Sequence, residues 1–123
     1  MSKTSILARI VLTLAAFAFA SSAAAQNYPS KPIRIIIPFA AGGTSDILAR
    51  LIGPKLTEAW SQPVIVENKT GANGNLAAEF VSKSPPDGYT LMLGDVGALT
   101  INPSVYTTNA LDPVKDFSQV IMV

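Results

Sequence analysis

From residue 28 onward, short apolar runs alternate with polar segments that contain glycine or proline. Three of these runs are rich in β-branched residues, which predicts strands over 33–37, 63–68 and 89–93. The first run is almost continuously apolar, as in a strand that is covered on both faces. The last run, 118–123, also predicts a strand.

Between the first two strands, apolar residues recur at helical spacing and predict an amphipathic helix. The positions expected on its apolar face are Ile47, Leu48, Leu51, Ile52, Leu56, Ala59 and Trp60. Thr44 is the best N-cap residue. Pro54 should kink the helix or split it near Arg50, because proline has no N–H donor. A shorter helix is predicted over 76–82 and a single helical turn over 112–117.

The predicted order is βαβαβ, which belongs to the α/β class. Right-handed crossovers between parallel strands place helices on both faces of the sheet. Glycine-containing loops over 38–46, 69–75 and 94–100 follow the three strands, and Asn102-Pro103 is expected to break the chain afterwards. Because parallel strands end at one edge, these loops should meet there, where open α/β sheets bind ligands.

The first loop leads directly into the predicted helix. Its candidate ligand-binding residues are Ala41, Gly42, Gly43, Thr44, Ser45 and Asp46. Such a turn directs backbone N–H groups, at the positive end of a helix dipole, toward an anion or carboxylate. Its two glycines either let the backbone approach a ligand or simply permit a tight turn. Asp46 is expected mainly to start the helix and brace the loop, since its charge would repel an anion.

The second loop contains Gly71, Ala72, Asn73 and Gly74, and its glycines leave the same two interpretations open. Lys69 is the only cation in the three loops and is expected to be a solvated surface residue. In the third loop, Asp95 and Thr100 either line a cleft or cap a turn, and the sequence does not separate these roles.

The first 25 residues have the pattern of a secretory signal peptide. Lys3 and Arg9 make a basic start, 10–20 is an apolar run, and a stretch of alanines ends at Ala25. The apolar run is shorter than the ~20 residues that span a membrane. We therefore expect cleavage after Ala25 and a mature chain of 26–123 that works outside the cytoplasm.

Composition narrows the chemistry further. The chain has no cysteine and no histidine, which excludes disulfides, thiol nucleophiles, Ser–His–Asp catalysis and the usual zinc sites. Nine cations against eight acids leave no excess charge that would suggest nucleic-acid binding. No metal or cofactor is expected.

Five segments in order, 28–46, 62–74, 86–91, 102–106 and 115–117, resemble the substrate-binding receptors of the tripartite tricarboxylate transporters, the Bug family. The resemblance implies a two-domain, type II periplasmic-binding-protein-like fold that closes over a small organic carboxylate. It also implies delivery of the acid to a membrane permease, or in some cases a report to a sensor kinase. Ligand contacts would come from residues 41–46 and 71–74.

The resemblance further implies that 26–123 is the N-terminal part of ligand-binding domain 1, with the second domain absent. Ser61 stands where the family usually has glycine, and Thr70 where proline is common. Two alternatives remain open: a truncated, non-functional receptor fragment, and a nucleotide-binding α/β enzyme. The second lacks support in the loops, because Ala41–Asp46 does not fit G-x-G-x-x-G and no Walker lysine follows.

Overall fold

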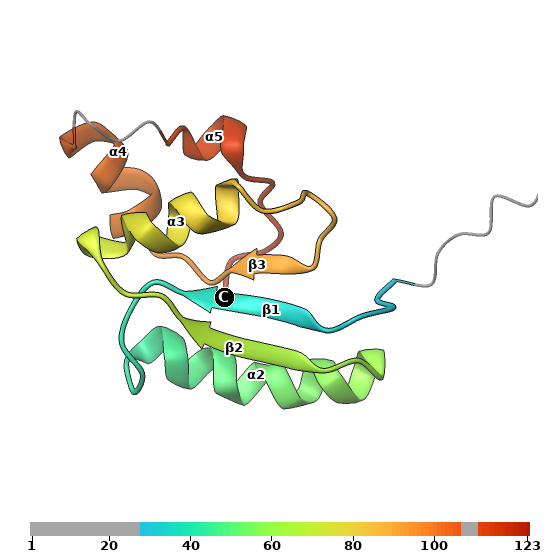
Figure 1. Ribbon diagram of the computed structural model, residues 1–123. Helices are drawn as coiled ribbons and strands as arrows, with labels where there is room; N and C mark the ends of the chain where they lie inside the picture. The colour runs from blue at the N-terminus through green and yellow to red at the C-terminus, as the bar shows by residue number, and fades with distance from the viewer. Residues whose placement is uncertain (1–27, 107–110) are drawn as a thin grey trace, which may run out of the picture.

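The structure, a computed structural model, describes residues 28–106 and 111–123, so the predicted leader, 1–25, lies outside it. Three parallel strands form one sheet in the order β2-β1-β3 (Figure 1). They are β1 (Ile33–Ile37), β2 (Val64–Asn68) and β3 (Thr90–Met92). The three predicted strands are confirmed, the second and third slightly shorter than expected.

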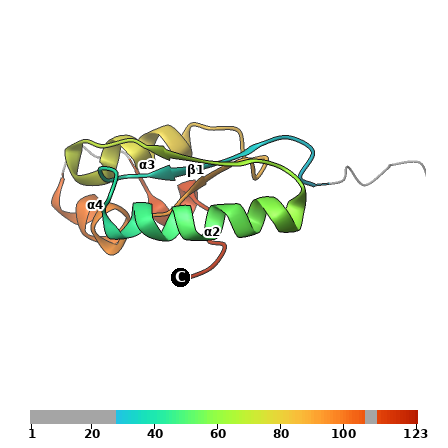
Figure 2. The same cartoon turned by 90° about the horizontal axis from the view of Figure 1, so that it is seen from below.

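Helices cover both faces of this sheet, which confirms the predicted α/β class. Helix α2 (Thr44–Trp60) joins β1 to β2, and α3 (Asn75–Ser82) joins β2 to β3. In Figure 2, β1 lies between α2 and α3. The remaining elements are the 3₁₀ turn η1 (Ala72–Gly74), the π-helix η2 (Gly97–Ile101), α4 (Asn102–Val105) and α5 (Pro113–Asp116). Within the described residues, no helix is long and apolar enough to cross a membrane.

The core is built around the central strand. Ile33, Ile36 and Ile37 of β1 have no exposed surface. Ile35 and Ile37 pack with Ala49 of α2 on one face. Buried alanines of α3 contribute to the core as well. Since each buried isoleucine contributes roughly 1.5–3 kcal/mol, this strand is the main source of stability in the sheet.

Helix α2 differs from its prediction in two respects. It continues unbroken through Pro54, which lies on the exposed side of the helix. Because proline has no N–H, the carbonyl four residues earlier loses its helical donor, but on this side water can hydrate it. Its buried side carries the small residues Ala49 and Gly53, whereas Ile47 and Leu51, predicted to face inward, are 53% and 62% exposed. Helical spacing identified the large apolar residues, but the small ones set the closest approach to the sheet.

Two other predictions are wrong. Residues 118–123 form no strand, and their apolar side chains are exposed. A strand needs a hydrogen-bonded neighbour, and no described segment pairs with this one. Most of the third loop is helical, and Asn102-Pro103 continues that helical path into α4. Proline is tolerated there because it occupies the first turn of α4, where an N–H has no helical acceptor.

The Gly53→Ala substitution should stabilise the protein. A Cβ at this position would lie 3.8 Å from Val64 Cγ1 and from Val66 Cγ2, which is ordinary van der Waals contact. Alanine is favoured over glycine inside a helix, so the free energy of unfolding should rise by about 0.5–1 kcal/mol in urea denaturation.

Gly74→Ala is the matched control and should destabilise by at least about 1 kcal/mol. Its backbone has φ +91°, and a Cβ would lie 2.9 Å from that of Ala98 and 3.2 Å from that of Pro38. Equal effects of the two substitutions would contradict this account of the packing.

Candidate functional site

The first two loops meet at one edge of the sheet, as predicted. Strands β1 and β2 run parallel, and α2 and α3 both begin where these strands end (Figure 1). The N-cap of α2 is Gly43 rather than Thr44, and no side chain caps this helix. Thr44 is instead the first helical residue, because Gly43 already has the extended conformation of a cap. The N–H groups of the first turn therefore have no side-chain acceptor and are available at this edge.

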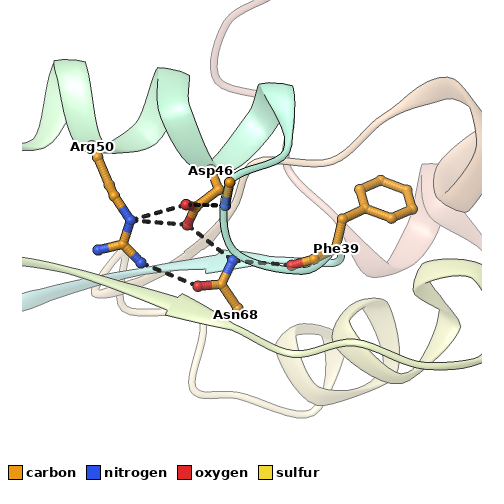
Figure 3. A network of polar contacts seen from close by, with 5 residues as sticks. Phe39, Asp46, Arg50 and Asn68 are labelled. Carbon is orange, nitrogen blue, oxygen red and sulfur yellow. Dashed lines mark hydrogen bonds and ion pairs between the residues drawn. The ribbon is translucent and has the colours of Figure 1, made fainter.

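The first loop is held by the buried carboxylate of Asp46, which is 3% exposed (Figure 3). Its Oδ2 accepts the Gly42 N–H at 2.9 Å. Arg50 Nε lies 3.1 and 3.0 Å from the two carboxylate oxygens, and Asn68 Nδ2 donates to Oδ1 at 2.9 Å. Asn68 also donates to the Phe39 carbonyl and accepts from Arg50, so the loop is tied to the end of β2. The bracing role expected of Asp46 is present in the structure.

This arrangement determines the electrostatics of the first loop. The Arg50 guanidinium, followed by the Gly42 and Asn68 donors, lowers the pKa of Asp46 from 3.8 to about 2. The carboxylate is therefore ionised but fully engaged by its own donors, with the Arg50 cation beside it. Gly42 has φ +87°, and a Cβ there would meet no atom within 4 Å. The side of the loop that Gly42 presents is thus open to an incoming group.

The second loop has an unusual backbone. Ala72 and Asn73 have φ of 47° and 53°, although neither is glycine, and Gly74 follows at 91°. Gly74 is buried between Pro38 and Ala98. Because it has no side chain, the first loop, the second loop and η2 can pack closely together at this position. Ala72 and Asn73 are exposed at the edge.

Other sequence-predicted residues have structural partners. Asp95 Oδ1 accepts the Ala98 N–H at 2.8 Å and so caps the start of η2. Thr100 is exposed within η2. Lys69 is half-buried with its Nζ 4.2 Å from the centre of the Phe80 ring, so it packs on α3 instead of being fully solvated.

Sequence reasoning missed Asn102. The sequence indicates a chain break and a segment of the family resemblance at this residue but no side-chain role, yet Asn102 is buried and hydrogen-bonded to Asn73 of the second loop. The one signal that could have identified it is an asparagine within an apolar stretch, where a polar side chain needs partners.

Comparison with known proteins identifies the family. Residues 48–123, more than half of the chain, match the model of the tripartite tricarboxylate transporter family receptor. The chain belongs to this family. The matched region includes β2, the second loop and η2, and the resemblance inferred from sequence motifs is confirmed.

Curated relatives of this receptor-family chain include a UPF0065 protein of Agrobacterium vitis, 43% identical over 81% of the chain and 29% of the relative. Protein BugT of Bordetella pertussis is 36% identical over the whole chain and 38% of the relative. The chain thus spans about a third of the length of the curated relatives that it matches.

Solved receptors share the fold. MatC from Rhodopseudomonas palustris, solved with bound malate, is 38% identical, with a TM-score of 0.69 over 73% of this chain and 31% of MatC. Rpa4515 of R. palustris, solved with adipate, is 41% identical, with a TM-score of 0.67 over 71% of this chain and 29% of that protein. These comparisons give no support to the nucleotide-binding enzyme.

The pH dependence of stability should report the Asp46 network. Because the folded pKa of Asp46 is lowered, its ionised form stabilises the fold above the unfolded value, and this contribution is lost as pH falls from 3.8 to about 2. Across this window, the thermal midpoint of the unchanged protein should fall more steeply than that of Asp46→Asn. Glu58→Gln, which removes an exposed carboxylate from the same helix, is the control for the loss of one negative charge. Identical slopes for Asp46→Asn and the unchanged protein would contradict the network.

Proposed function

We propose that this chain supplies part of a periplasmic solute-binding receptor for a small organic carboxylate, delivered to a tripartite tricarboxylate-type membrane permease. Residues 26–123 would be the N-terminal part of ligand-binding domain 1. The ligand would contact residues 41–46 and 71–74. The main support for this proposal is that the start of α2 has no side-chain cap. The loop before it is held at the sheet edge by the buried carboxylate of Asp46.

The chemistry of this edge suits a carboxylate. The first N–H groups of α2 carry the positive end of the helix dipole, and a carboxylate oxygen is a good acceptor for them. The Asp46 charge, the nearest negative charge on α2, is occupied by Arg50, Gly42 and Asn68 and is not free to repel an anion. Thr44 and Ser45 add hydroxyl donors in the first turn.

The family supports the ligand class but not one acid. MatC and Rpa4515 were solved with malate and adipate, two dicarboxylates of different length. Both ligands share a terminal carboxylate group, and a helix N-terminus can bind one such group. We therefore propose that the loops described here bind that shared group, while the rest of the acid is recognised by other parts of the receptor.

Amide chemical shifts provide the test. Isotope-labelled protein without residues 1–25 is titrated with malate and adipate, and separately with adenine nucleotides. The dicarboxylates should shift the amides of Thr44, Ser45 and Asp46 together with those of 71–74. Binding should be weak, because the two loops contact the ligand from one side and leave it in water, which screens each charge-assisted contact.

Malamide is the matched control ligand, since it keeps the shape of malate and removes its charge. It should leave both loops unshifted at the same concentration. Shifts caused by nucleotides and by neither acid would reject the receptor in favour of the enzyme.

Export is tested at the N-terminus of the mature protein. If the leader is cleaved after Ala25, sequencing of periplasmic material should begin at Gln26, because signal peptidase cuts after small residues. Replacing Ala23 and Ala25 with bulky residues should leave the leader attached. Intact Met1 in the membrane fraction of the unchanged protein would instead indicate an uncleaved anchor.

A further inference from the structure

The side chain of Asn102 joins two segments that are far apart in the sequence. Its Nδ2 donates to the Asn73 carbonyl at 2.7 Å and to Asn75 Oδ1 at 2.8 Å. Its Oδ1 accepts from Asn73 Nδ2 at 2.9 Å. Asn102 is 1% exposed, so both donors and its acceptor are directed to the second loop and the start of α3.

The backbone of the second loop needs stabilising contacts from residues outside the loop. Ala72 and Asn73 lie in the left-handed region, which is unfavourable for a residue with a Cβ. Backbone of this kind persists only where its surroundings fix it. Asn102 bonds both the main-chain carbonyl and the side chain of Asn73, and so fixes the orientation of the adjoining peptide.

The position of Asn102 is itself set by an irregular helix. Its own N–H donates to the Gly97 carbonyl, five residues back, which closes the wide turn of η2. Asp95 caps the start of this turn. Helix η2 and the residue after it thus support the second loop, and Gly74 packs against Ala98 of η2.

We propose that Asn102 is a positioning residue for ligand binding: it holds residues 71–74 in the conformation that presents the exposed part of the loop, Ala72 and Asn73, to the carboxylate. This inference rests on the proposed function. Asn102 is buried and acts through the loop, so it does not touch the ligand itself.

The first test compares Asn102→Ala with Ser104→Ala, a control at an exposed position of the same short helix. Malate is titrated into each labelled protein. In Asn102→Ala the affinity should fall about tenfold. The amides of Ala72 and Gly74 should lose their response while those of Thr44 and Ser45 keep it. Ser104→Ala should match the unchanged protein. Equal affinity and equal shifts at both loops in Asn102→Ala would overturn the proposal.

A measurement without ligand separates this inference from the proposed function. The Gly74 N–H donates to the Gly71 carbonyl at 3.0 Å and reports the closed form of the loop. Its hydrogen exchange should accelerate at least about tenfold in Asn102→Ala, with no change in the helical amides of α2. If no acid shifts any amide of the unchanged protein, the proposed function fails, and exchange still decides whether Asn102 holds the loop. Unchanged exchange would overturn the positioning role.

Asn102→Leu keeps the branched shape of the side chain, fills the buried position and removes the hydrogen bonds, so it covers the case in which the alanine variant fails to fold. It should show the same selective loss at Ala72 and Gly74. A leucine variant that binds malate as the unchanged protein does would show that packing alone shapes the loop, and would overturn the proposal.

Discussion

The burial of β1 on both faces is the constraint on which the rest of the structure depends. A central strand with isoleucines directed to both sides needs a helical layer above and below it. Parallel neighbours on both edges then require right-handed crossovers, so α2 and α3 start from the same end of the sheet. The meeting of the two loops follows from this topology rather than from any attraction between them.

A carboxylate in the first turn of a helix that is proposed to bind an anion presents an electrostatic conflict. Asp46 would stabilise the helix start through the dipole, yet an exposed negative charge there would repel an acid. The structure resolves this by turning the side chain inward, where Arg50, Gly42 and Asn68 satisfy it. The same contacts fix the loop, so one residue both removes the repulsion and provides the rigidity.

The sequence predicted the three strands, the two helices that join them and the meeting of their loops, because these depend on local periodicity and on parallel topology. It placed the buried side of α2 on Ile47 and Leu51, since large apolar residues dominate a periodic pattern while small ones decide how closely a helix packs. The hydrogen-bond partners of Asn102 could not be predicted, because they lie 27 and 29 residues away. Long-range amide pairs leave no periodic signal.

Rigidity in both loops bears on affinity through entropy. A loop that is ordered before the ligand arrives loses less conformational freedom on binding, so more of each hydrogen bond contributes to affinity. The first loop is held by Asp46 and the second by its packing around Gly74 and by Asn102. Gly74 also lies beside Pro38, at the start of the first loop, so the two loops are ordered next to each other. The two loops are therefore preorganised separately, each by its own hydrogen bonds, and the entropy saved at each loop adds to the affinity for a ligand that touches both.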